Sequence, residues 1–173
     1  AVGYQAAYAN TTGDLNTAIG RLALYANTTG ASNTAVGSGA MVTNSTGAEN
    51  TAVGRDALTT NSTGNYNTAF GKNALNSNTT ASNNTAVGYR AGYSLTTGAS
   101  NTIVGNDAGY SVTGDLNTLV GKDAGYYITS GTKNTVIGKY NGNQGGLDIR
   151  TASNYIVLSD GDGNPRDRKS TRL

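Results

Sequence analysis

Residues 33–49 read NTAVGSGAMVTNSTGAE, and residues 50–66 follow the same pattern as NTAVGRDALTTNSTGNY. In this unit Asn-Thr precedes two small or apolar residues and a glycine, and an alanine lies three positions after the glycine. The glycine recurs every 17 residues, with one step of 16, at Gly3, Gly20, Gly37, Gly54, Gly71, Gly88, Gly105, Gly121 and Gly138. A register kept over nine units indicates a tandem repeat.

The length of the unit selects the fold class. Seventeen residues are too few for a pair of helices and a turn, which take about 33 residues or more. The clusters of Gly, Asn and Thr favour turns over helix. The sequence therefore predicts an all-β fold, a parallel β-solenoid of about nine 17-residue coils stacked about 4.8 Å apart.

Stacking places equivalent residues above one another in columns. Thr and the aliphatic residue two positions later share one face of a strand. We expect this aliphatic column to point into the core, and the alanine column to form the opposite wall. The aliphatic column includes Val36, Val53, Val87, Val104 and Val120.

Three polar or glycine columns accompany the aliphatic one. The Asn column before the strand predicts a ladder of side-chain amides, with ligand binding as the alternative; it includes Asn33, Asn50, Asn67 and Asn101. The first glycine column predicts corners with positive φ, and it includes Gly37, Gly54 and Gly88. A second glycine column predicts the same conformation at the other turn, at Gly13, Gly30, Gly47, Gly64, Gly98, Gly114 and Gly131.

Two further columns change together along the chain. Early coils place a large residue after the alanine, such as Leu58, and an Asn in the turn, such as Asn61. Later coils place glycine and an aliphatic residue there instead, such as Gly109 and Val112. Because a close-packed core must stay filled, this exchange predicts that Leu58 and Val112 reach the same core space. The alternative is two unrelated subfamilies of repeat.

Composition excludes much chemistry. The chain has no Cys, which excludes thiolate metal sites and cysteine nucleophiles. It also has no His, the commonest general base. We therefore expect no catalytic residue, no cofactor and no enzyme activity. No apolar run reaches the roughly 20 residues of a membrane helix, so we expect no membrane contact in this fragment.

The end of the chain departs from the repeat. Residues 167–173 read DRKSTRL, which resembles the translation of a sequencing-adapter oligonucleotide, so we expect a non-native tail on a metagenomic fragment. The tail holds three of the twelve basic and one of the ten acidic residues, so the remainder is neutral. The net charge of +2 then gives no reason to expect nucleic-acid binding. We expect the repeat domain at 1–140, a linker at 141–153 and a strand and turn at 154–166.

Two weaker signals concern binding. Asp160, Asp162 and Asn164 have the spacing that begins a calcium loop, but Pro165 stands where an EF-hand needs glycine. A hairpin turn is the alternative, and we expect no metal site. Tyrosines also recur beyond the alanine, and these aromatic rings would either stack on glycans or cover a neighbouring subunit. They are Tyr8, Tyr25, Tyr93, Tyr110 and Tyr126.

The N-T-A-V-G signature with its downstream alanine resembles the head repeats of YadA-like trimeric autotransporter adhesins. It is also similar to the shafts of tailed-phage tail fibres. The resemblance covers about residues 1–140 and implies a left-handed parallel β-roll in which three chains pack into one rod. The adhesin repeat is typically shorter, with N-S-V-A-I-G where this chain has N-T-A-V-G.

The expected function is a non-catalytic, extracellular fibre on a bacterial surface or a phage virion. We expect it to form a homotrimer and to bind a cell-surface glycan or protein receptor. Trimerisation has a physical motive, because each coil offers few large aliphatic residues for a monomeric core. We expect Ala, Leu and Tyr after the first glycine to form the apolar strip between chains. An ice-binding solenoid and a polysaccharide-binding phage depolymerase are the alternatives.

Overall fold

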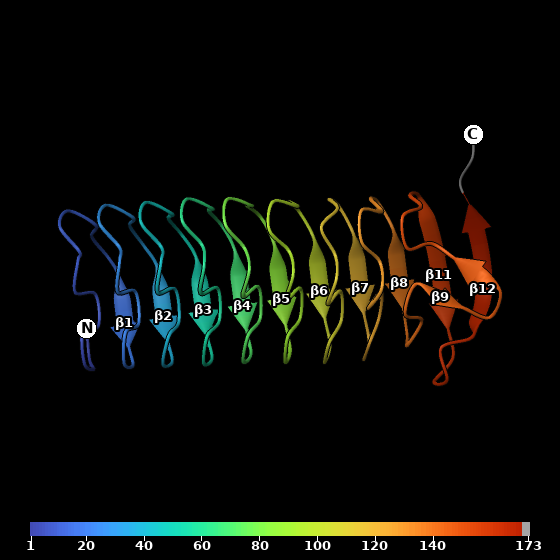
Figure 1. The fold of residues 1–173 in the computed structure, drawn as a ribbon, viewed down its shortest axis with the longest axis horizontal. Helices are drawn as coiled ribbons and strands as arrows, with labels where there is room; N and C mark the ends of the chain where they lie inside the picture. Colours follow the sequence, from blue (N-terminus) through green and yellow to red (C-terminus); the bar gives the residue numbers. More distant parts are fainter. Residues whose placement is uncertain (171–173) are drawn as a thin grey trace.

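The chain forms a straight all-β rod with its two ends at opposite tips (Figure 1). The computed structural model describes the backbone of residues 1–170 and the side chains of residues 1–166, and this part contains no helix. It is a parallel β-solenoid of about eight turns, which confirms the predicted fold class. One short strand from each turn joins the sheet: β1 (Thr17–Ile19), β2 (Thr34–Val36), β3 (Thr51–Val53), β4 (Thr68–Phe70), β5 (Thr85–Val87), β6 (Thr102–Val104), β7 (Thr118–Val120) and β8 (Thr135–Ile137).

The strands pair in perfect repeat register. Each Thr opposes the Thr of the next coil, and each apolar third residue opposes its equivalent, as in Thr34↔Thr51 and Val36↔Val53. Equivalent side chains are therefore stacked along the whole rod, about 4.8 Å apart from one coil to the next. The repeat thus arranges its side chains in columns that run along the rod.

The side of the strand that faces the core is the reverse of the predicted one. The middle residue of each strand is buried, and Ala35 and Ala52 are fully inaccessible. Thr and the aliphatic residue flank it and point outward together, because neighbours along a strand face opposite sides. The prediction of an inward aliphatic column was therefore wrong for its partly exposed members, which include Val36, Val53, Val87, Val104 and Val120.

The opposite wall of the core agrees with the sequence. The alanine column is fully buried from Ala23 to Ala124. Leu58 and Val112 are both inaccessible to solvent, which confirms that both positions fill the core. The later strands also enlarge their middle residue from Ala to Ile103, Leu119 and Val136. A Cβ on Gly109 would lie 3.0 Å from Leu119 Cδ1 and 3.1 Å from Ile103 Cδ1, so this glycine makes room for the larger strand residues.

The two glycine columns serve different purposes. Gly37, Gly54 and Gly88 have φ of 135°, 134° and 133°, which confirms the predicted corner. The second column does not adopt positive φ, so that prediction was wrong. A side chain there would instead strike the next coil, since a Cβ on Gly98 would lie 2.6 Å from the carbonyl oxygen of Gly114.

Asparagine side chains form the predicted ladder inside the rod. Asn50 donates its backbone N–H to Asn33 Oδ1 (3.0 Å), and Asn67 does the same to Asn50 (2.9 Å). Asn101 and Asn117 continue the column with a 2.9 Å bond. The side-chain Nδ2 of Asn50 also donates to the carbonyl oxygen of Gly64 (2.8 Å). These buried amides satisfy backbone groups that the turns leave unpaired, which supports the structural interpretation of the column.

Residues 141–153 belong to the fold, so the prediction of a linker was wrong. Strands β9 (Asn143–Gln144) and β10 (Leu147–Asp148) form a small antiparallel hairpin. Tyr140 and Ile149 are fully buried in the core cluster. This segment is the long turn of one more coil, because β11 (Tyr155–Ser159) adds to β8 as a further parallel strand.

Strand β12 (Pro165–Ser170) closes this end of the sheet by pairing antiparallel with β11. Its backbone includes residues 167–170, the first part of the expected non-native tail. Pairing of Val157 with Arg168 brings this segment into the sheet. Residues 171–173, the end of that tail, lie outside the described residues.

Candidate functional site

The outward side of the long sheet is a flat face built from two columns, which we call the outer sheet face. One column is Thr, from Thr17 to Thr135, and the other is aliphatic or aromatic, from Ile19 to Ile137. Ile19, Phe70 and Ile137 are 44%, 55% and 40% exposed. Ile156 and Leu158 on β11 pair with Thr135 and Ile137 and extend the face. The valines of the column are partly exposed, so the column is a continuous, partly exposed apolar strip, which is typical of an interaction surface.

The predicted leucine and alanine strip does not form. Ala57 and Leu58 are fully buried, as are their equivalents in the other central coils. They fill the core because the chain turns inward after each corner glycine. The apolar surface available to a partner is therefore the outer sheet face, which the sequence had assigned to the interior.

The predicted tyrosine column forms two stacks. Tyr8 and Tyr25 stack with ring centroids 5.6 Å apart. Tyr93, Tyr110 and Tyr126 form a second stack with centroid distances of 5.1 and 4.9 Å. In such a stack the ring faces cover one another, so the middle rings offer mainly their edges to a ligand.

An ion pair lies beside the second stack. Arg90 Nε donates to Asp107 Oδ1 at 2.7 Å, and its guanidinium lies 5.0 Å from the Tyr110 ring centroid. The hydrogen bond to Asp107 raises the pKa of Arg90 above its usual value. Burial raises the pKa of the Tyr126 hydroxyl. This surface is thus aromatic and locally charge-balanced.

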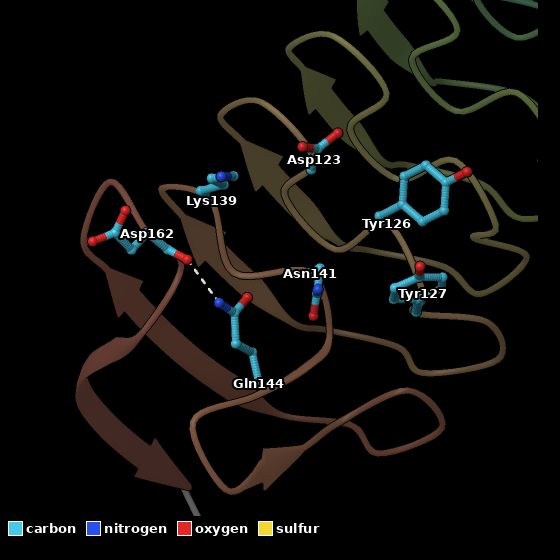
Figure 2. A pocket seen from close by; sticks show the side chains of 7 residues that line it. All are labelled: Asp123, Tyr126, Tyr127, Lys139, Asn141, Gln144 and Asp162. Carbon is cyan, nitrogen blue, oxygen red and sulfur yellow. Dashed lines mark hydrogen bonds between the residues drawn. The ribbon is translucent and has the colours of Figure 1, made fainter.

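Tyr126 ends the stack at a hollow of about 360 Å³ near the C-terminal tip of the rod. Figure 2 shows the seven side chains around this hollow, which come from two consecutive coils and from the β11–β12 turn. They are Asp123, Tyr126, Tyr127, Lys139, Asn141, Gln144 and Asp162. The sequence reasoning singled out Tyr126 and Asp162 separately. Asn141 and Gln144 lie where the repeat loses its register, whereas Asp123, Tyr127 and Lys139 keep the register but belong to columns whose residue types vary from coil to coil.

A second hollow also borders Tyr127. It is lined by Tyr127, Thr129, Asp148, Arg150 and Thr151. Arg150 Nη2 and Asp148 Oδ2 are 2.8 Å apart, and this hydrogen-bonded pair lowers the pKa of Asp148. Tyr127 is 51% exposed and lines both hollows.

No family model, curated protein or solved structure matches the chain. The geometry of its own surfaces therefore carries the functional argument. In the described residues, no helix has the length and apolar character that a membrane crossing requires.

The candidate calcium residues form a hairpin turn between β11 and β12. Asp160 Oδ1 accepts the backbone N–H groups of Asp162 (3.0 Å) and Asn164 (2.9 Å). Arg166 Nη2 lies 2.7 Å from Asp160 Oδ2. The hydrogen bond from the Asn164 backbone, the largest cause, holds the pKa of Asp160 below its usual value. Within residues 1–166, no group of three His, Cys, Asp or Glu side chains is placed to hold a metal ion.

Proposed function

We propose that this chain is a rod segment of an extracellular, non-catalytic fibre of the YadA-like adhesin or tail-fibre type. It assembles as a homotrimer and binds a cell-surface glycan or protein receptor. The observation that carries the proposal is the outer sheet face, a partly exposed apolar column that runs the length of a repetitive rod. The N-T-A-V-G signature occurs at residues 33–37, 50–54 and 84–88, and five further coils keep its Asn, Thr and Gly, which supports the choice of family.

The repeat explains why a threefold assembly fits. Each coil presents the same Thr and aliphatic pair on the outer sheet face, so an axis parallel to the rod keeps equivalent coils in phase. Three copies around that axis cover the apolar columns of one another. Burial of a half-exposed aliphatic column contributes about 25 cal/mol for each Å² of apolar surface removed from water. The contribution increases with every coil.

Trimerisation also supplies a binding mechanism. A rigid rod with three copies of each surface converts weak contacts into strong attachment, because later contacts form at high effective concentration. The expected gain over a single chain is about 10²- to 10⁴-fold when the geometry allows simultaneous contact. This mechanism requires no reaction step.

The assembly is tested by light scattering on the full chain. We expect a mass of about three times 17.5 kDa. Val53→Asp places a carboxylate in the outer sheet face and is expected to give monomers, since burying an unpaired charge is costly. Thr97→Asp adds the same charge at an exposed turn position and should leave the trimer intact. A stable wild-type monomer would overturn the assembly.

The adhesive role is tested on an array of immobilised glycans and on intact cells. Wild-type protein should be retained at least 100-fold more tightly than the monomeric Val53→Asp variant. Equal retention would contradict multivalent attachment. Release of shortened chains from a soluble polysaccharide would contradict the non-catalytic role and favour the depolymerase.

The outer sheet face also favours a second candidate, an ice-binding solenoid. The Thr column lies outward beside the aliphatic column on a flat and regular surface. Ice binding needs this face uncovered, whereas trimerisation covers it. A monomer that shows thermal hysteresis, with the effect abolished by Thr51→Tyr, would replace the fibre proposal.

A further inference from the structure

Tyr127 is the centre of a surface site that the repeat itself does not explain. It departs from the column pattern, since its equivalents in the preceding coils include Ser111 and Ser94. Its ring meets Tyr126 edge to face with centroids 4.8 Å apart. The Tyr126 ring stacks in turn on the Tyr110 ring, with centroids 4.9 Å apart. Tyr127 therefore packs against a ring that is itself held in place.

The first hollow, which Tyr126 and Tyr127 line, combines aromatic rings with polar groups that hydrogen bonds hold in place. Gln144 Nε2 donates to the backbone carbonyl of Asp162 at 2.7 Å, which fastens the β9–β10 hairpin to the β11–β12 turn (Figure 2). Asn141 Oδ1 accepts the backbone N–H of Asn143 at 3.0 Å, so its amide plane is fixed. Lys122 Nζ donates a hydrogen bond to Asp123 Oδ2 at 2.7 Å. Side chains already held in place lose little conformational entropy when a ligand binds.

The second hollow also contains polar side chains that hydrogen bonds hold in place. Asp148 accepts two bonds from the Arg150 side chain, at 3.0 and 2.8 Å, which orients both groups. Thr129 Oγ1 donates to the Arg150 carbonyl at 3.1 Å. The wall shared by the two hollows is Tyr127.

This chemistry matches a pyranose ring better than other ligands. A sugar ring has an apolar face of C–H groups that packs on an aromatic ring, and a rim of hydroxyls that bond to carboxylate, amide and ammonium groups. Amphipathic aromatic rings serve such mixed surfaces because one end is apolar and the other polar. Two hollows that share one ring as a lining residue fit two consecutive sugar units.

The charges select a neutral sugar. In the first hollow the carboxylates of Asp123 and Asp162 are matched by the ammonium groups of Lys139 and of Lys122, which is bonded to Asp123, and in the second Asp148 is neutralised by Arg150. These groups therefore give the two hollows no net charge. An anionic sugar would find no unmatched cation there, so it would gain no net electrostatic attraction.

We propose that the two hollows flanking Tyr127 form a binding site for a neutral oligosaccharide of at least two pyranose units. This inference rests on the proposed function, because it names the receptor class that the rod would bind. One copy on each chain of a trimer gives three equivalent sites near the C-terminal tip. Individually weak sugar contacts then add up to attachment.

The site is tested by calorimetric titration of the full chain with chitohexaose, cellohexaose and maltohexaose, with hexagalacturonate as the anionic comparison. We expect at least one neutral oligosaccharide to bind, and to bind at least tenfold more tightly than hexagalacturonate. Tyr127→Ala should weaken binding at least tenfold, and Tyr127→Trp should retain it because the ring face is kept. Tyr66→Ala is the matched control, since Tyr66 is similarly exposed (56%) but lies far from the hollows along the chain.

The outcomes separate this site from the fibre proposal. No binding of any of the three neutral hexasaccharides, or unchanged binding by Tyr127→Ala, would overturn the site. Light scattering on the same samples reports the trimer independently, because Tyr127 is not on the outer sheet face. A trimer that does not bind sugar therefore refutes only the site, whereas a sugar-binding monomer refutes only the fibre assembly.

Discussion

At the residue scale, many side-chain-bearing residues adopt the left-handed conformation that normally favours glycine. After Gly54, for example, Asp56, Leu58 and Tyr66 have φ of 56°, 51° and 59°. Each costs about 1–2 kcal/mol relative to a right-handed residue. Stacking holds them in place, since the Leu58 N–H bonds to Ala74 O (2.9 Å) and the Asp56 N–H to Ser38 O (3.0 Å). Coils on both sides thus enforce a backbone that one coil alone would not keep.

Leu58 tests the packing of the early coils. Leu58→Ala should lower the free energy of unfolding by about 2–5 kcal/mol, because stacked backbones prevent the cavity from collapsing. Urea unfolding at fixed protein concentration provides the measurement. Leu116→Ala is the control, since Leu116 is 51% exposed and its truncation leaves no cavity. Equal losses for the two variants would contradict the assigned core.

Gly92 tests the exchange between core positions. Leu at the equivalent site of other coils has the same left-handed φ, so Gly92→Leu tests space rather than backbone conformation. A Cβ there would lie 3.1 Å from Ile103 Cδ1, so overpacking should cost about 1–3 kcal/mol.

Ile103→Ala should relieve that crowding. The double variant Gly92→Leu/Ile103→Ala is expected to be more stable than the sum of the two single losses predicts. Urea midpoints of all four proteins give the coupling energy. Strict additivity would show that the two positions do not share space.

At the element scale, the asparagine column in the turns ends where one type of coil gives way to the other. The turn column donates from Asn78 Nδ2 to Asn61 Oδ1 at 2.8 Å. The next member of that column is Leu95, so Asn78 Oδ1 has no hydrogen-bond partner among the described residues. A buried acceptor without a partner costs about 1–3 kcal/mol. Beyond this point the aliphatic stack of Leu95, Val112 and Ile128 replaces the asparagines of the turn column, whereas the ladder before the strands continues.

The β11–β12 turn should depend on pH through Asp160. The pKa of its carboxyl is lowered in the folded protein, so its stabilising effect is complete above the ordinary value near 3.8 and is lost as pH falls through the lower folded value. The groups facing it are Arg166 and the backbone of Asp162 and Asn164. Hydrogen exchange of the β11 amides should therefore accelerate relative to those of β3 as the pH is lowered below 4.

Asp160→Asn supplies the comparison for that turn. It should make β11 exchange faster at pH 6 and remove most of the extra change on acidification. An unchanged wild-type ratio between β11 and β3 from pH 6 to 2.5 would contradict this role for Asp160.

At the scale of the whole molecule, stability is expected to depend on protein concentration. If unfolding requires trimer dissociation, a hundredfold increase in concentration stabilises each chain by about 2 kcal/mol. Thermal unfolding followed by circular dichroism should give a rising Tm for wild type and a constant Tm for Val53→Asp. A wild-type Tm independent of concentration would argue against linked dissociation.

The C-terminal tip shows how distant features combine. The β9–β10 hairpin and the β11–β12 turn interrupt the repeat, and both contribute to the hollow beside Tyr127. These segments also cover the last coil, as terminal units of a solenoid must to shield their core. Capping and the candidate sugar site are thus properties of the same irregular end.

The sequence by itself determined that the chain is a stacked β-solenoid, with an asparagine ladder, corner glycines such as Gly54 and an alanine wall. These features follow from a 17-residue register, because stacking copies every local property into a column. Only the tertiary structure decided which side of each strand faces the core. A three-residue strand such as Thr51–Val53 is too short for alternation to reveal its buried side, and the left-handed residues that close the coil leave no sequence signature.

The candidate site likewise combines a feature that the sequence predicts with features that only the fold creates. Repetition made the tyrosine stack predictable, since Tyr93, Tyr110 and Tyr126 share a column. The hollows beside Tyr127 were not predictable, because Gln144 and Asp162 lie outside the register, and only the folded hairpin and turn bring them beside Lys139. The repeat predicts side-chain positions only where its period continues, and beyond that point long-range backbone packing determines the surface.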